Sequence, residues 1–232
     1  MRIDSDREKN ALIVFAKEPR LNRVKTRLLK DFSAQATTRL YTAFVKDVLK
    51  TARIVRCHKK FIYYTGARNI PFLGRFQKNF FMARQRGKNL GERMYAAFAK
   101  SRNDGNTKTV IIGTDCPTLG AGDIREAFRK LTNHDVVLGP CRDGGYYLIG
   151  LKEPKKSLFA NIRWSSSAVL RETIQRAIEI GKKVYLLGQR EDIDTVENLR
   201  NLLKNKRAQK QARHTFALAK KMTNGKGSRN GK

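Results

Sequence analysis

Short apolar runs alternate along this chain with longer amphipathic segments. The runs are rich in branched and aromatic residues and cover 11–16, 61–64, 79–82, 109–113, 135–138, 146–150 and 183–187. Between them, apolar residues three or four positions apart predict helices. These helices are expected over 33–53, 90–101, 123–131 and 166–180, with a closing helix that begins at residue 195. Strands that alternate with helices predict an α/β protein, a three-layer α/β/α sandwich whose mostly parallel sheet is covered on both faces.

The sixth run reverses this pattern. Only a short polar turn separates it from the fifth run, and a parallel connection needs a dozen or more residues. The two runs are therefore expected to pair antiparallel, which makes the sheet mixed.

The length of 232 residues fits one domain of ordinary size followed by a tail. We expect the domain to cover 10–203 and a basic, partly disordered tail to cover 204–232. From Leu199 onward the chain contains no Asp or Glu. The first part of the tail could extend a helix, whereas 223–232 is rich in Gly, Asn and Lys and is typical of disorder.

The chain is strongly basic, with 50 Lys and Arg against 20 Asp and Glu and a formal charge of +30. Such a charge can indicate a nucleic-acid partner. Here it is spread along the whole chain, which favours a phosphate-handling enzyme with a cationic tail, so no specific nucleic acid is expected. The 3 cysteines form no C-x-x-C pair, which predicts reduced thiols in the cytoplasm. No apolar run approaches the roughly 20 residues of a membrane span.

A cationic loop follows the first buried strand. α/β proteins hold phosphates outside the carboxyl ends of their strands, where backbone N–H groups of the next helix also point. We therefore predict that cations of this loop contact a nucleotide, namely Lys17, Arg23, Lys25 and Arg27. The glycines of the segment before the second helix, Gly87 and Gly91, could contact a base or ribose.

Two acidic motifs suggest a divalent metal. Asp115 follows a fully buried strand, and hard cations that bridge phosphates prefer oxygen ligands. The carboxylates of Asp192 and Asp194 point the same way in an extended segment and could complete the metal shell. Alternatively, Asp115 caps a turn, and Asp194 or Thr195 is the N-cap of the final helix.

The turn between the fifth and sixth runs carries a third motif. Asp143 could accept a proton or hold a sugar hydroxyl, and Gly144 and Gly145 would let the backbone approach a substrate. The alternative is a hairpin turn chosen only for its geometry. Tyr146 and Trp164 are further candidates for contact with an acceptor, although a single tryptophan is more often part of the core.

These motifs resemble, in order, those of one family. They are Phe-Ala-Lys-x-Pro at 15–19, Arg-Val-Lys-Thr-Arg-Leu at 23–28, Leu-Gly-Glu-Arg-Met at 90–94, Gly-Thr-Asp-Cys-Pro at 113–117, Gly-Pro-x-x-Asp-Gly-Gly-Tyr-Tyr-Leu-Ile-Gly at 139–150, Trp-Ser at 164–165 and Asp-x-Asp-Thr at 192–195. The family is the CofC-like glycosyltransferase-like proteins related to phospholactate guanylyltransferase, found near radical-SAM and selenodomain proteins. Some members are named arsenosugar biosynthesis glycosyltransferases.

The resemblance implies the nucleotide-diphospho-sugar transferase fold of the GT-A type. It also implies that Lys25 and Arg27 contact nucleotide phosphates, and that Asp115 and Asp194 bind Mg²⁺ or Mn²⁺. The chain departs from the family pattern at 20–22, where Arg-Leu-Asn replaces a Pro-Gly turn. Asn22 tolerates a positive φ, so the turn can persist. It departs again where Val196 and Asn198 replace Pro and Asp of Asp-x-Asp-Thr-Pro-Glu-Asp.

The function expected from these features is metal-dependent glycosyl transfer from a nucleotide-diphospho-sugar to a small-molecule acceptor. The first alternative is nucleotidyl transfer from a nucleoside triphosphate to a small phosphorylated acceptor, as in a guanylyltransferase. The second is a basic nucleic-acid-binding protein.

Overall fold

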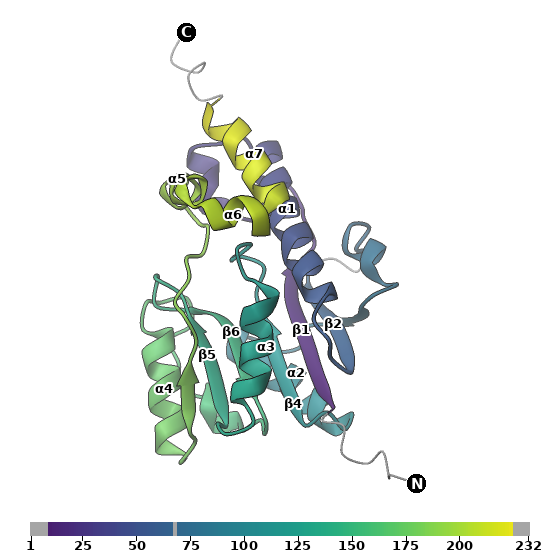
Figure 1. The fold of residues 1–232 in the computed structure, drawn as a ribbon, viewed down its shortest axis with the longest axis vertical. Coiled ribbons are helices and arrows are strands. Elements are labelled where there is room, and N and C mark those ends of the chain that lie inside the picture. The colour runs from purple at the N-terminus through teal and green to yellow at the C-terminus, as the bar shows by residue number, and fades with distance from the viewer. Residues whose placement is uncertain (1–8, 67–68, 225–232) are drawn as a thin grey trace.

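The structure, a computed structural model, describes residues 9–66 and 69–224 and contains a seven-stranded sheet with helices on both faces (Figure 1). The strands are β1 Asn10–Lys17, β2 Lys59–Thr65, β3 Phe81–Arg84, β4 Lys108–Ile112, β5 Val136–Pro140, β6 Tyr146–Leu151 and β7 Val184–Leu186. The α-helices are α1 Ala34–Arg53, α2 Leu90–Asn103, α3 Ala121–Lys130, α4 Val169–Glu179, α5 Val196–Lys204, α6 Lys206–Gln211 and α7 Arg213–Asn224. Short 3-10 helices cover Thr26–Lys30, Leu73–Phe76 and Lys156–Phe159.

The strand order is β3-β2-β1-β4-β6-β5-β7, and β6 runs antiparallel to both of its neighbours. The other strands pair in parallel, so the predicted mixed sheet is confirmed. Because β6 is antiparallel to both β4 and β5, strand β5 runs in the same direction as β4 and β1. The β5–β6 turn therefore lies at the end of the sheet where β1 and β4 also end. Three loops therefore meet at that end.

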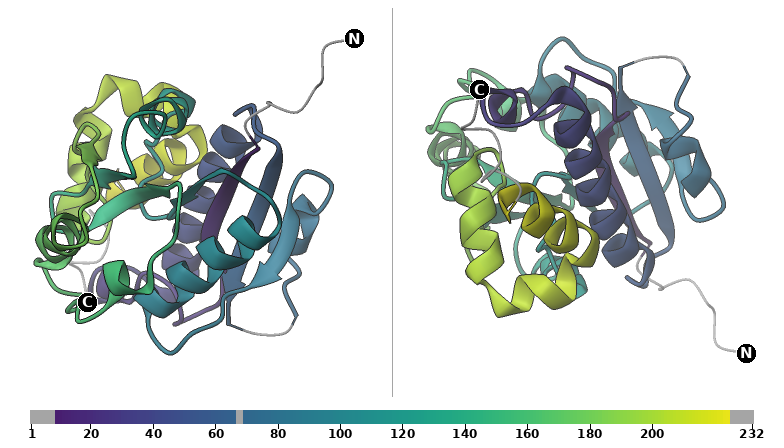
Figure 2. Two further views of the ribbon diagram at one scale, coloured as in Figure 1. Left: turned by 90° about the horizontal axis from the view of Figure 1, so that it is seen from below. Right: turned by 90° about the horizontal axis from the view of Figure 1, so that it is seen from above.

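Two apolar cores lie on opposite faces of the sheet. One joins Leu12 and Val14 of β1 to Phe44 of α1 and Phe128 of α3. The other joins Ile13 of the same strand to α2 and α4. This alternation along β1 is what a strand buried on both faces requires. The three-layer α/β/α prediction is confirmed (Figure 2).

Helix α1 forms where the sequence predicts it. Ser33 is its N-cap and accepts a hydrogen bond from the N–H of Ala36. Leu40, Phe44 and Val48, which are spaced four residues apart and share one face of the helix, are fully buried. A capped helix with a continuous apolar stripe is stabilised both locally and by packing.

Two elements begin two or three residues later than predicted. Helix α4 begins at Val169 rather than Ser166, because the Ser166 hydroxyl donates to the Arg163 carbonyl within a turn. Strand β3 begins at Phe81, because the N–H groups of Asn79 and Phe80 still donate to the Phe76 carbonyl. Local turn hydrogen bonds therefore delay both elements.

The folded part of the chain continues beyond residue 203. Helices α6 and α7 cover most of 206–224, and α7 packs against α1 (Figure 1). The helical extension considered for the tail is thus present, whereas the segment 225–232 lies outside the described residues.

A buried carboxylate joins α7 to α1. Asp47 of α1 is 1% exposed and accepts four hydrogen bonds at the start of α7. They come from the N–H and Nδ1 of His214 and from the N–H and hydroxyl of Thr215. A carboxylate at a helix N-terminus satisfies otherwise unpaired N–H groups.

In the described part of the chain, no helix is long and apolar enough to cross a bilayer.

Candidate functional site

Strands β1 and β4 are parallel neighbours at the point where the strand order reverses. In open α/β sheets, ligands bind in the crevice outside the carboxyl ends of the strands at such a point. The loops after β1 and β4 converge there, together with the β5–β6 turn and the extended segment before α5.

Lys25 lies at the centre of this convergence. Its side chain is only 3% exposed, and its Nζ lies 2.7 Å from Asp115 Oδ1 and 2.7 Å from Asp194 Oδ1. Burial alone would lower the pKa of Lys25, but the two carboxylates outweigh burial and raise the pKa above its usual value. Lys25 is therefore charged. It joins the segment that carries Asp115 to the segment that carries Asp194, 79 positions later in the sequence.

Asp194 is held by cations on both of its oxygens. Its Oδ1 contacts Lys25, and its Oδ2 lies 3.2 Å from Nη1 of Arg27. Burial would raise the pKa of Asp194, but Lys25 and then Arg27 lower it. The structure thus brings together the predicted phosphate contacts Lys25 and Arg27 and the predicted metal ligands Asp115 and Asp194, with a lysine between the two carboxylates.

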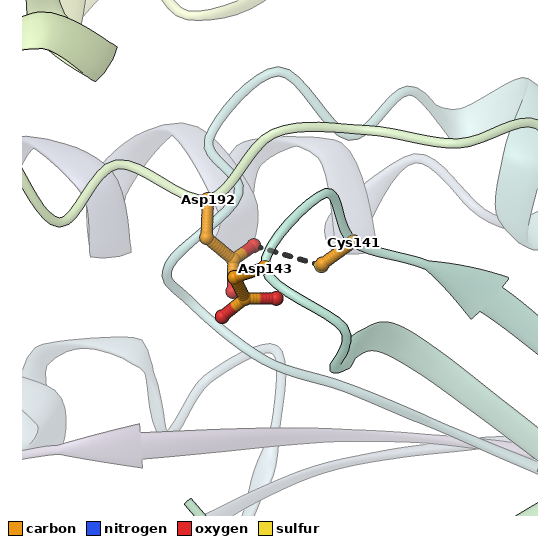
Figure 3. A group of neighbouring side chains, drawn as sticks. All are labelled: Cys141, Asp143 and Asp192. Atoms are coloured by element: carbon orange, nitrogen blue, oxygen red, sulfur yellow. Dashed lines mark hydrogen bonds between the residues drawn. The ribbon is translucent and has the colours of Figure 1, made fainter. Parts of the chain in front are cut away.

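A second acidic group lies in the β5–β6 turn and the segment before α5. Figure 3 shows Cys141, Asp143 and Asp192, whose ligand atoms all lie within 4.8 Å of one another. The Cys141 thiol donates to Asp192 Oδ1 at 3.1 Å. Burial raises the pKa of Asp192 to about 7, and the charges of Asp115 and Asp143 add to the increase. Asp192 is therefore the carboxyl group whose charged form this cluster disfavours.

Backbone hydrogen bonds fix these two segments to each other. The N–H of Arg190 donates to the Pro140 carbonyl, and the N–H of Arg142 donates to the Arg190 carbonyl. The N–H of Ile193 donates to the Asp115 carbonyl at 3.0 Å, which ties the segment to the end of β4. Arg190 also holds Asp123 of α3 with two contacts of 2.7 Å. These hydrogen bonds hold together the backbone segments that carry Asp115, Asp143 and Asp192.

The raised pKa of Asp192 predicts a pH-dependent stability. A carboxyl group with a folded pKa near 7 opposes folding above its unfolded pKa near 4, and this penalty disappears as the pH falls from 7 to 4. In metal-free protein, Asp192→Asn should therefore be more stable than wild type at pH 8, by about 2 kcal/mol after allowance for partial exposure. Urea unfolding with a chelator at pH 5 and pH 8 measures the difference.

Asp135→Asn is the matched control. The N–H of Lys183 lowers the pKa of Asp135, so its contribution is present above pH 4 and is lost in acid. The variant should be less stable than wild type at pH 8, which is the opposite sign. An Asp192→Asn variant that shows no pH-dependent gain would contradict the electrostatic coupling of the cluster.

The remaining cations of the first loop point outward. Lys17 and Arg23 are exposed, and the N–H of Lys17 donates to the hydroxyl of Tyr41, which also bonds to Thr114. Asn22 has a φ of +59°, so the turn predicted to tolerate an Asn does adopt the left-handed conformation. Lys25 itself has a φ of 47°, a backbone conformation that costs energy and that its two ion pairs help to maintain.

The glycines and the tryptophan have structural roles at α2. A Cβ on Gly91 would lie 2.4 Å from Cζ2 of Trp164, so the indole packs on the helix where a side chain would be. Gly87 has a φ of +137° and lies against the backbone of Arg93. These contacts explain both glycines without a base or ribose, and they place Trp164 against the core that contains α2.

The β5–β6 turn requires one of its glycines. Gly144 has a φ of +89°, and a Cβ there would lie 2.0 Å from the Ser167 carbonyl oxygen. Asp143 is exposed and accepts a hydrogen bond from the N–H of Gly145. The hydroxyl of Tyr146 lies 3.8 Å from Met94 Sδ within the α2 core, so this side chain would have to move to contact an acceptor.

Sequence reasoning missed Glu18, Cys141 and Arg190. Glu18 is buried and accepts hydrogen bonds from the N–H groups of Phe72 and Leu73. Cys141 lies within the Gly-Pro-x-x-Asp-Gly-Gly motif, a position that could have suggested it. For Glu18 and Arg190, the partners are distant in sequence and no local pattern signals them.

A groove of about 370 Å³ also lies between α1 and α7, with a basic rim and an apolar floor. It is lined by Arg39, Thr42, Ala43, Lys46, His214, Ala217, Leu218 and Lys221. None of the predicted site residues lines it, so it is separate from the convergence around Lys25.

The structure resembles several solved structures, two of which carry the name of a transferase. One is a Desulfovibrio desulfuricans G20 protein named "putative nucleotide-diphospho-sugar transferase", with 28% identity, a TM-score of 0.81 and coverage of 93% of this chain and 99% of that chain. A Leptospira borgpetersenii cytidylyltransferase has 14% identity and a TM-score of 0.53, with coverage of 97% and 99%. Rv0371C of Mycobacterium tuberculosis H37Rv, solved with manganese, has 15% identity and a TM-score of 0.50, with coverage of 84% and 98%.

The first of these similarities supports the nucleotide-diphospho-sugar transferase superfamily, and the other two show the fold alone. No curated protein matches the chain. The family described as "Uncharacterized protein conserved in bacteria (DUF2064)" matches residues 48–166. This segment is more than half of the chain and includes Asp115, Cys141 and Asp143, and the protein accordingly belongs to the DUF2064 family.

Proposed function

We propose that this protein is a metal-dependent glycosyltransferase that uses a nucleotide-diphospho-sugar donor and a small-molecule acceptor, as its resemblance to the CofC-like and arsenosugar glycosyltransferases suggests. The similar structures support the broader class of nucleotide-using transferases. The observation that carries the proposal is the convergence of Lys25, Arg27, Asp115 and Asp194 outside the ends of β1 and β4.

Different cations would have different roles. The guanidinium of Arg27 is largely exposed despite its ion pair with Asp194, and Lys17 and Arg23 are exposed as well, so all three are accessible to a diphosphate. Lys25 is already held by two carboxylates and would position Asp115 and Asp194. Asp143 is exposed beside Asp192 and would accept the proton of an acceptor hydroxyl.

The donor set fits a divalent metal. Carboxylate oxygens of Asp115 and Asp192 suit Mg²⁺ or Mn²⁺, and burial together with the charges of neighbouring carboxylates raises the pKa of Asp192, so a bound cation would stabilise its charged form. Asp115 with Asp192 would hold the ion, because Lys25 contacts only Oδ1 of Asp115, whereas Lys25 and Arg27 together contact both oxygens of Asp194. When bound, the metal neutralises charge that develops on the departing diphosphate.

Nucleotidyl transfer is the second candidate, and the similarity to a cytidylyltransferase favours it. A phosphorylated acceptor is already an anion, so positioning and charge neutralisation would suffice. The same cations and carboxylates would serve this reaction, in which no proton acceptor is needed.

Products distinguish the two reactions. Purified protein is incubated with Mn²⁺ or Mg²⁺ and a panel of nucleotide-sugars or nucleoside triphosphates, with candidate sugar and phosphorylated acceptors. Donors and metals are first chosen by the rise in melting temperature that a native-state ligand produces. We expect release of a nucleoside diphosphate from a nucleotide-sugar. Pyrophosphate from a triphosphate, without any release from nucleotide-sugars, would replace glycosyl transfer by nucleotidyl transfer.

A further inference from the structure

We infer that Cys141 is a ligand of the metal at this site, together with Asp192, and that its sulfur makes the site favour Zn²⁺ or Co²⁺ over Mg²⁺. The inference rests on the metal dependence proposed above and names the chemistry of that metal. It concerns a residue that neither the motif reasoning nor the proposed reaction uses.

The geometry is close to that of a bound ion. The donor atoms of Cys141, Asp143 and Asp192 lie within 4.8 Å of one another, and Cys141 Sγ is 3.1 Å from Asp192 Oδ1 (Figure 3). Sulfur and oxygen ligands of one tetrahedral zinc lie roughly 3.5 Å apart at ordinary bond lengths. The 3.1 Å between Cys141 Sγ and Asp192 Oδ1 differs from that separation by roughly half an ångström, so both atoms can bind one cation after a small shift.

The three positions are held by the backbone. Cys141 forms a β-bridge with Arg190, two residues before Asp192. The N–H of Cys141 donates to the Gly145 carbonyl, and the N–H of Gly144 donates to the Cys141 carbonyl, so the turn that carries Asp143 closes on the cysteine. A frame that fixes ligands before the metal arrives reduces the ordering cost of binding.

The surroundings of Cys141 are unusual for a structural thiol. It is 1% exposed, yet its sulfur faces a carboxylate instead of an apolar side chain. The nearby cation Lys25 is engaged by Asp115 and Asp194. Cation binding would release the thiol proton to solvent and leave a thiolate as ligand. Soft thiolate ligands select Zn²⁺ and Co²⁺, whereas Mg²⁺ requires oxygen.

Cobalt absorption tests the inference directly, without an activity assay. The full-length protein, freed of metal by a chelator and kept reduced, is titrated with Co²⁺ while its near-ultraviolet spectrum is recorded. We expect a thiolate-to-cobalt charge-transfer band that Zn²⁺ abolishes. Cys141→Ser should lack the band and bind Zn²⁺ at least about tenfold more weakly, while its Mg²⁺ affinity changes little.

Matched variants identify the sulfur. Cys116→Ser removes the other buried thiol, and Cys57→Ser removes a partly buried thiol near β2; both should keep the band. Cys141→Ala provides a second test if the serine variant is poorly folded, as judged by circular dichroism. A band that persists without Cys141, or that is lost only with Cys116, would overturn the assignment.

The readouts separate this inference from the proposed function. A protein without a cobalt–thiolate band that still releases nucleoside diphosphate with Mg²⁺ would refute the role of Cys141 and leave the transferase intact. A band that depends on Cys141, in a protein without transfer activity on any donor, would support the metal site and refute the proposed reaction.

Discussion

Asp115→Asn should lower kcat for transfer by at least about a hundredfold, because it removes the charge of the carboxylate that follows β4 and faces both Lys25 and the acidic cluster. The fold should survive, since Lys25 keeps its ion pair with Asp194. Steady-state rates with Mn²⁺ and the best donor measure the loss. The metal-dependent rise in melting temperature caused by that donor should also disappear.

Asp104→Asn is the control for this variant. Asp104 lies at the end of α2 in a surface pair with Lys100, so its neutralisation should leave the rate unchanged. An Asp115→Asn enzyme that keeps its rate and its metal response would remove this carboxylate from the reaction and, with it, the main support for metal-dependent transfer.

Asp47→Ala should lower the free energy of unfolding by about 3 kcal/mol, since it deprives two N–H groups and a hydroxyl of α7 of their acceptor. For a chain of this size, that loss corresponds to a fall in melting temperature of about 6–12 °C. Urea unfolding and calorimetry of wild type and variant measure both quantities.

Asp104→Ala serves as the comparison, because a surface ion pair contributes at most about 1 kcal/mol. Hydrogen exchange should show that the α7 amides lose protection in Asp47→Ala before those of β1 do. Equal stability of wild type and Asp47→Ala would mean that α7 is held by its apolar contacts with α1 alone.

Local signals account for what the sequence predicted. A short apolar run, an amphipathic repeat and the short β5–β6 link predicted β1, α1 and the antiparallel β6, and all three are present. The rule that parallel strands end at one edge of a sheet also led to the proximity of Lys25 and Asp115. These inferences need only neighbouring residues or the general geometry of sheets.

Long-range contacts account for what the sequence did not predict. Lys25 lies between two carboxylates instead of facing solvent, because segments far apart in the chain enclose it. Cys141 meets Asp192 only because the β5–β6 turn and the segment before α5 are hydrogen-bonded in one register. The position of α7 depends on Asp47, which in the sequence is one polar residue within an apolar helix face.

The borders of the sheet limit how copies of this protein can associate. Its outermost strands are β3 and β7, with 4 and 3 residues. Such short edge strands offer few unpaired N–H and C=O groups to a strand of a second molecule. Two copies would therefore gain little stability by pairing their sheets edge to edge. Stable dimers would therefore have to form through helices or loops.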